Sequence, residues 1–157
     1  MKILLAVDGS SFSDSAIAEV GSRVWAPATE IKVVTAFQVP ITPSPEVWTI
    51  SDEYYPALEN AAREQAQAVV DAAVAKLTAR LPESLSLSGE VLNGPAREAI
   101  LDEAERWGAD LIVMGSHGYG AWQRLLLGSV SQAVVSHANC SVEVVHRRRN
   151  DNDAKAA

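Results

Sequence analysis

Residues 111–129 read LIVMGSHGYGAWQRLLLGS, and this stretch decides the fold class. It begins with the short apolar run 111–114, which Gly115 stops. Such a run between turn signals is typical of a strand that is buried on both faces. A glycine-rich loop follows, and an amphipathic helical pattern then covers residues 129–137. The stretch therefore predicts one strand–loop–helix unit of an α/β protein.

The same alternation of strand and helix continues through the chain. Apolar runs predict strands at 3–7, 31–39, 85–92, 111–114 and 142–145. Helical periodicity between them predicts helices at 13–24, 57–81, 95–107 and 129–137. Strict alternation indicates a single open, five-stranded parallel sheet with helices on both faces and right-handed crossovers. We expect one domain over residues 1–146, a loop at 40–56 and a polar, flexible tail at 147–157.

Composition excludes several classes of protein. The 157 residues include 13 Lys and Arg against 20 Asp and Glu, a net charge of −7, which disfavours a general nucleic-acid binder. The single cysteine, Cys140, excludes an internal disulfide and a Cys-based zinc site. His137 and His146 lack metal-ligand spacing, so we expect no metal held by the protein alone. The apolar segments are too short to span a membrane, so we expect a soluble cytoplasmic protein.

The candidate site lies in the loops after the first and fourth strands, because open α/β sheets bind ligands beyond the carboxyl ends of their strands. Glycines in the loop after the fourth strand can adopt positive φ and let a ligand approach backbone amides. The helix that begins at Ser129 offers free N–H groups and a positive dipole end. Hydroxyls of Ser129 and Ser131 can add donors, and Arg124 is the nearest fixed positive charge. Ser129 and Gln132 have capping-box spacing, which predicts a cap for this helix.

Two common phosphate motifs do not fit this loop. A Walker sequence needs Lys after its second glycine, whereas Ala121 and Trp122 follow Gly120 here. A dinucleotide-binding G-x-G-x-x-G sequence fails because Gly118-Tyr119-Gly120 leads to Gln123. The loop therefore belongs to neither a P-loop NTPase nor a standard dinucleotide binder.

The pattern that is present is G-x₂-G-x₉-G-S, formed by Gly115, Gly118, Gly128 and Ser129. Together with the opening ILLAVDGS at 3–10, it resembles the UspA-like universal stress protein family, in its ATP-binding branch. The resemblance extends over about residues 1–146 and includes the turn Gly94-Pro95. It implies the Rossmann-like strand order 3-2-1-4-5, a cytoplasmic homodimer through the last strand (Val142, Val144), and bound ATP with Mg²⁺.

The resemblance also implies roles for individual residues. One group would line the adenine and ribose, with Asp8 accepting a hydrogen bond: Val7, Asp8, Ala36, Met114 and Gly115. A second group would hold ribose and phosphates, largely through backbone amides: Gly118, Gly128, Ser129, Val130 and Ser131. Asp8 also suits an Asx turn, and His117 suits a polar residue that shapes the loop.

Three functions remain open at this stage. The leading one is a nucleotide-dependent regulatory module in stress resistance, without catalytic residues. The second is a slow ATPase or phosphotransferase, for which only Arg124 and Asp8 are candidate groups, whereas phosphoryl transfer needs a positioned metal, a cationic clamp and an orienting group. The third is an interaction dimer with an empty site. Adenosine contacts would be shared by AMP or a cyclic nucleotide, so those ligands are alternatives to ATP.

Overall fold

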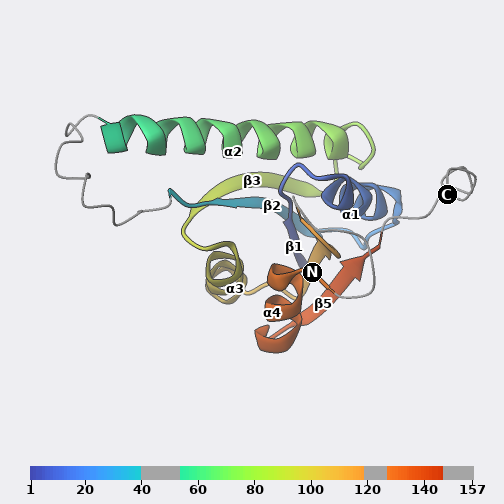
Figure 1. Cartoon of the computed structure of the whole chain (residues 1–157). Helices are drawn as coiled ribbons and strands as arrows, with labels where there is room; N and C mark the ends of the chain where they lie inside the picture. The colour runs from blue at the N-terminus through green and yellow to red at the C-terminus, as the bar shows by residue number, and fades with distance from the viewer. Residues whose placement is uncertain (40–53, 119–126, 147–157) are drawn as a thin grey trace, which may run out of the picture.

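The computed structural model describes residues 1–39, 54–118 and 127–146 (Figure 1). Every predicted strand and helix is present within a few residues of its expected limits. The elements are β1 (Lys2–Ala6), α1 (Ser11–Ser22), β2 (Glu30–Phe37), α2 (Tyr54–Thr78), β3 (Ser86–Asn93), α3 (Ala96–Trp107), β4 (Leu111–Gly115), α4 (Ser129–His137) and β5 (Ser141–Val145). Among the described helices, none is both long enough and apolar enough to cross a membrane.

All strands pair in parallel in the order β3-β2-β1-β4-β5, which confirms the predicted sheet. The central strand β1 pairs on both sides, so that Leu4 lies opposite Lys32 of β2 and Ile112 of β4. The chain moves outward from β1 to β3 and then returns to β4 on the other side of β1. The loops after β1 and β4 therefore separate toward opposite faces, which is where such sheets form a ligand crevice.

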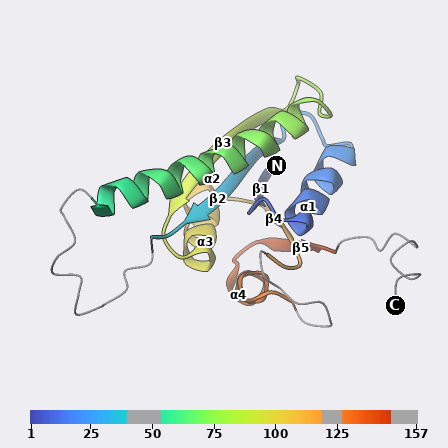
Figure 2. The ribbon, with the colours of Figure 1, turned by 45° about the horizontal axis from the view of Figure 1, so that its top comes forward.

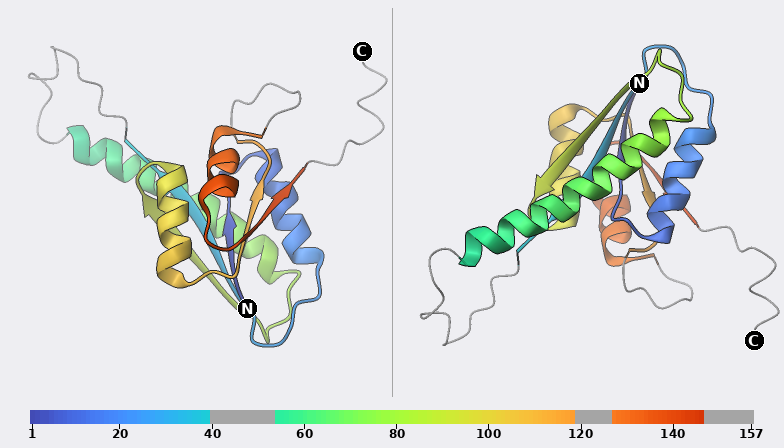
Figure 3. Two further views of the ribbon diagram at one scale, coloured as in Figure 1. Left: turned by 90° about the horizontal axis from the view of Figure 1, so that it is seen from below. Right: turned by 90° about the horizontal axis from the view of Figure 1, so that it is seen from above.

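Two helical layers bury the two faces of the sheet (Figures 2 and 3). On one face, Ile3 and Leu5 pack in a cluster with residues of α1 and α2 such as Val20 and Leu77. On the other face, Leu4 and Ala6 pack with residues of α3 and α4. The alternation along β1 follows from the two-residue period of a strand. It explains why β1 and β4 are apolar at nearly every position.

The outer strands β3 and β5 are less buried than strands predicted from apolar runs usually are. In β3 only Leu92 is buried, and no residue of β5 is fully buried. Within the described part of the chain, each of these strands pairs with a single strand. The serines that alternate with leucines in β3 face solvent for this reason, and the apolar-run signal overstated the burial of both strands.

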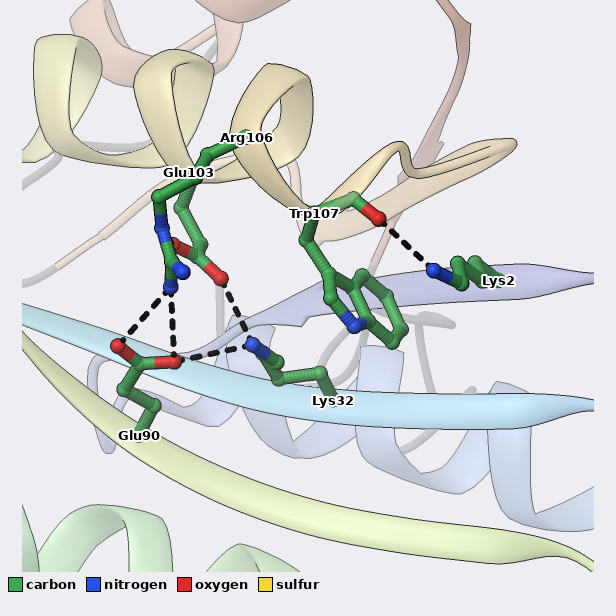
Figure 4. A network of polar contacts seen from close by, with 6 residues as sticks. All are labelled: Lys2, Lys32, Glu90, Glu103, Arg106 and Trp107. Atoms are coloured by element: carbon green, nitrogen blue, oxygen red, sulfur yellow. Dashed lines mark hydrogen bonds and ion pairs between the residues drawn. The ribbon is translucent and has the colours of Figure 1, made fainter.

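A group of ion pairs fixes the C-terminal half of α3 on the sheet (Figure 4). Lys32 Nζ on β2 lies 2.8 Å from Glu103 Oε1 of α3 and 3.0 Å from Glu90 Oε2 of β3. Arg106 pairs with the same two carboxylates. Burial lowers the pKa of Lys32, but its hydrogen bonds to Glu103 and Glu90 outweigh that effect and raise the pKa above its ordinary value. The carboxylate of Glu103, with only 3% of its side chain exposed, is therefore compensated by two cations.

The indole of Trp107 completes this attachment. Lys2 Nζ lies 5.3 Å and Lys32 Nζ lies 5.0 Å from the ring centroid, within cation–π range. Lys2 Nζ also donates a hydrogen bond to the carbonyl of Trp107. The last turn of α3 is thus joined to β1 and β2, which fixes the helix whose first turns border the candidate site.

Candidate functional site

A cavity of about 420 Å³ opens at the carboxyl ends of β1, β2 and β4. Its volume lies within the range of small-molecule sites. Every predicted site residue that the structure describes lines it: Val7, Asp8, Ala36, Met114, Gly115, Gly118, Gly128, Ser129, Val130 and Ser131. The remaining prediction, Arg124, lies outside the described residues. The two separate loops read from the sequence therefore border one cavity.

The cavity has an apolar end and a polar end. Apolar side chains from β2, β4 and α3 form the first: Val34, Ala36, Ala96, Ile100 and Met114. Groups from the loops after β1 and β4 and from the start of α4 form the second: Asp8, Ser13, His117, Gly118, Gly128, Ser129 and Ser131. Among the described lining residues, Asp8 is the sole carboxylate and neither Lys nor Arg occurs. A negatively charged group of a ligand would therefore have to be bound by N–H and hydroxyl donors at this end of the cavity.

Asp8 forms the Asx turn that its position suggests. Its Oδ1 accepts a hydrogen bond from the Ser10 N–H at 3.0 Å. Ser10 is the N-cap of α1, where its Oγ accepts from the Ser13 N–H, and the Ser13 hydroxyl donates back to the Ser10 carbonyl. Gly9 between them has a φ of +78°, which favours glycine. The N-terminus of α1 is therefore capped by the side chain of Ser10.

The described glycines of the loop after β4 serve close approach and not positive φ. Among the described glycines, positive φ occurs at Gly9, Gly94 and Gly108 but at no glycine of the signature, so that part of the prediction is wrong. A Cβ on Gly118 would lie 2.7 Å from Asp8 Oδ2. The absence of a side chain at Gly118 therefore lets the loops after β1 and β4 meet.

Two of these glycines have a packing reason that needs no ligand. A Cβ on Gly115 would lie 2.7 Å from the carbonyl carbon of Phe12, so Gly115 allows α1 to approach β4. A Cβ on Gly128 would lie 3.3 Å from the Cα of His117. Packing alone therefore requires glycine at position 115 and favours it at position 128, whether or not the cavity binds a ligand.

Three hydrogen bonds close the base of the loop between β4 and α4. The Gly128 N–H donates to the Ser116 carbonyl at 2.8 Å. The buried Ser131 hydroxyl lies 3.0 Å from the same carbonyl and 2.9 Å from that of Gly128. Its single proton is engaged by these acceptors, so Ser131 offers a ligand its backbone N–H in place of the predicted hydroxyl donor.

Helix α4 begins without a side-chain cap, which contradicts the predicted capping box. Its N-cap is Gly128, and Ser129 is the first helical residue. The Gln132 N–H bonds to the Gly128 carbonyl at 2.9 Å, as in a regular first turn. The N–H groups of the first turn thus have no intrahelical acceptor and lie beside the cavity. This arrangement can bind an anion.

Several cavity residues could not be found by reading the loops after strands one and four. Ala96 and Ile100 come from α3, which packing brings against the ends of β1 and β2. Ser13 comes from the first turn of α1. His117, by contrast, lies in the loop after β4 and was expected to shape it; it is half-buried, with Nδ1 3.1 Å from Ser116 Oγ and its ring centroid 5.1 Å from that of Phe12. Ile100 belongs to the apolar face predicted for the helix at 95–107, and this was the available signal that it would pack against the sheet.

Comparison with known proteins identifies the family. Residues 1–146 match the model of the universal stress protein family. The chain belongs to that family. A universal stress protein of Thermus aquaticus is 36% identical over 143 residues, covering 91% of this chain and 96% of that protein. The chain spans only about half of another relative, Rv2005c of Mycobacterium tuberculosis, at 36% identity.

Solved structures of the family share the fold. The structure of MJ0577 superposes with a TM-score of 0.78 at 27% identity, covering 95% of this chain and 97% of that one. An Arabidopsis thaliana family member with AMP bound has a TM-score of 0.66 at 20% identity, covering 99% and 96%. A universal stress protein in complex with cAMP has a TM-score of 0.63 at 24% identity, covering 94% and 98%. Adenine nucleotides are thus bound by proteins of this fold.

Proposed function

We propose that this universal stress protein is a regulatory module that binds an adenine nucleotide, with ATP as its principal ligand. The observation that carries the proposal is one cavity with an apolar end and, at its other end, the uncapped N-terminus of α4. A nucleotide has the matching polarity, because its base is flat and largely apolar on its faces whereas its phosphates are anionic.

The apolar end would accept the adenine. Met114 and Ile100 approach it from β4 and α3, and the small side chains of Ala36 and Ala96 leave room between them. Apolar burial favours binding by about 25 cal/mol per Å² of surface removed from water. The ribose would then lie near Asp8, whose carboxylate can accept a hydrogen bond from a sugar hydroxyl.

The phosphates would lie at the first turn of α4. The N–H groups of Ser129, Val130 and Ser131 belong to that turn, and the helix dipole adds partial positive charge there. Among the described residues, no group of three or more His, Cys, Asp or Glu side chains is arranged for a metal ion. A Mg²⁺ ion that accompanies ATP would therefore be held chiefly by the phosphates, where it would offset their charge.

A second candidate is a nucleotide with a single phosphate. The family members with bound AMP and bound cAMP favour it, since both ligands share adenosine with ATP. The absence of Lys and Arg from the described cavity lining also suits a ligand of lower charge. The two candidates differ in the number of phosphates that the first turn of α4 would bind.

The identity of the nucleotide is tested by denaturing the purified protein and analysing the released small molecules by mass spectrometry. We expect ATP, and calorimetry with added Mg–ATP should show one site per chain. Release of AMP or cAMP would favour the second candidate, and release of ADP would indicate slow hydrolysis. A protein that carries no nucleotide and binds none of these ligands would contradict the proposal.

We also propose that two copies pair through β5. This strand ends the order β3-β2-β1-β4-β5, so one side of its backbone pairs with no strand among the described residues. Val142 and Val144 are only partly buried there. Antiparallel pairing of two such strands would cover an exposed edge and give twofold symmetry. Light scattering at micromolar concentration should give the mass of a dimer, and a monomer mass would contradict this proposal.

A further inference from the structure

We propose that His117 donates a hydrogen bond from Nε2 to the ligand phosphate that lies nearest the ribose, and so makes the cavity prefer phosphorylated adenosine to adenosine. This inference rests on the proposed function, since it names the side chain that would recognise the phosphate in the same cavity. It begins from the polar end of the cavity, where a phosphate needs N–H and O–H groups that donate to it.

Most hydroxyl groups at the polar end are already used within the protein. The Ser13 hydroxyl donates to the Ser10 carbonyl at 2.9 Å. The Ser131 hydroxyl is engaged by the carbonyls of Ser116 and Gly128. Among the described side chains that line this end, Ser129 and His117 are left as donors. Of these two, only His117 offers a nitrogen donor.

The surroundings of His117 fix its ring. Nδ1 lies 3.1 Å from the Ser116 hydroxyl oxygen, and the ring lies against Phe12 with centroids 5.1 Å apart. The backbone of His117 lies directly beside Gly128, as the 3.3 Å clearance for a Cβ on Gly128 shows. The imidazole is therefore held between α1 and the start of α4, next to the amides proposed to bind phosphate.

The same contacts allow Nε2 to be the nitrogen that carries the proton. The Ser116 hydroxyl can donate its proton to Nδ1, which leaves the proton of a neutral imidazole on Nε2. Nε2 makes no hydrogen bond to any residue in the described part of the chain. An N–H at this position beside a phosphate would form a charge-assisted bond. It would act on phosphorylated ligands and not on adenosine itself.

The test compares three proteins and two ligands by calorimetry at one pH and salt concentration. The proteins are the native chain, His117→Leu and His117→Gln, and the ligands are adenosine and AMP. We expect His117→Leu to weaken AMP binding about tenfold or more while adenosine affinity changes less than about twofold. We expect His117→Gln to retain most of the AMP affinity, because its amide nitrogen can reach the place of Nε2.

The other outcomes separate the explanations. Equal losses of adenosine and AMP affinity in His117→Leu would overturn the proposal, because they would mean that His117 only shapes the loop. Unchanged AMP affinity in His117→Leu would overturn it as well, as would a Gln variant as weak as the Leu variant. If the native protein bound neither ligand, nor ATP, the proposed function itself would be contradicted. Thermal melting of each variant checks that all three proteins are folded.

Discussion

Helices α1 and α4 both begin just beyond a central strand, yet their N-termini differ. At α1 the Ser10 side chain caps the first turn, and Asp8 fixes Ser10 in place. At α4 the N-cap is Gly128, which has no side chain to offer. The first arrangement gives the Ser13 N–H a side-chain acceptor, whereas the first-turn N–H groups of α4 have no such acceptor among the described residues and lie beside a cavity. The residue at the N-cap, more than the helix itself, therefore determines which helix N-terminus can bind an anion.

Packing explains why the N-cap residue of α4 is a glycine. A Cβ at this position would come within 3.5 Å of Ser131 Oγ, 3.4 Å of the Ser116 carbonyl oxygen and 3.3 Å of the His117 Cα. The contact with the His117 Cα is tight, so a capping residue here would require a small shift of the loop backbone. Glycine at this position avoids that shift and leaves the amides of α4 without a side-chain cap.

The largest effect should follow from giving α4 the kind of cap that α1 has. Gly128→Asp places a carboxylate at the first turn, where it would compete with a ligand phosphate and repel it. We expect ATP affinity to fall more than about 100-fold, measured by calorimetry. Gly128→Ala is the control, since it adds the same Cβ without charge. If both variants bound ATP equally, charge at this helix end would not matter and the comparison would fail.

Gly118→Ala tests the contact between the two loops. Its Cβ would meet Asp8 Oδ2, and moving that carboxylate would disturb the Asx turn at Ser10. We expect about a tenfold to thirtyfold loss of ATP affinity. In an Asp8→Ala background the same change should have little further effect, because the clash has gone. An undiminished loss in that background would show that Gly118 acts without Asp8.

Ser129→Pro removes one N–H from α4 while the helix stays intact. Proline is favoured at the first helical position, and the ψ of +156° at Gly128 suits a residue before proline. We expect about a tenfold loss of ATP affinity. Ser129→Ala keeps the N–H and removes only the hydroxyl, so it should bind within about threefold of the native protein. The reverse ranking would assign the contact to the hydroxyl.

Ser10→Ala opens the cap of α1 and should affect stability more than binding. Loss of an N-cap side chain costs about 1 kcal/mol of unfolding free energy. Chemical denaturation should show this decrease, with ATP affinity nearly unchanged in the folded protein. A gain of a second nucleotide site would reveal that the cap alone separates the two helix ends. A large loss of ATP affinity would show that α1 contributes directly to the site.

The fold was largely predictable because strand runs and helix periodicity are local signals. Differences occur where local chemistry shifted a boundary. Helix α1 starts at Ser11 because Ser10 caps it, and α2 starts before Pro56, which the first turn of a helix tolerates. The strand order was available only through the family resemblance, and the low burial of β3 depends on its place at the sheet edge.

The site was predictable where it follows the strand ends and not where it depends on packing. The residues of the glycine signature line the cavity because they extend from the last residue of β4 to the first residue of α4. Ala96 and Ile100 arrive through the docking of α3, which no motif marks. The predicted capping box is wrong because Ser129 and Gln132, the two residues with the right spacing, both lie inside the helix, after the N-cap Gly128. Spacing alone could not show that Ser131 turns its hydroxyl toward Ser116.

The most direct test of the account follows the backbone amides of both helix starts by ¹H–¹⁵N NMR while Mg–ATP is added. We expect the N–H signals of Ser129, Val130 and Ser131 to shift most and those of Ser11 and Phe12 at the start of α1 to move little. Shifts concentrated at α1, or saturable binding without any change at the first turn of α4, would contradict the central claim that the uncapped helix holds the phosphates.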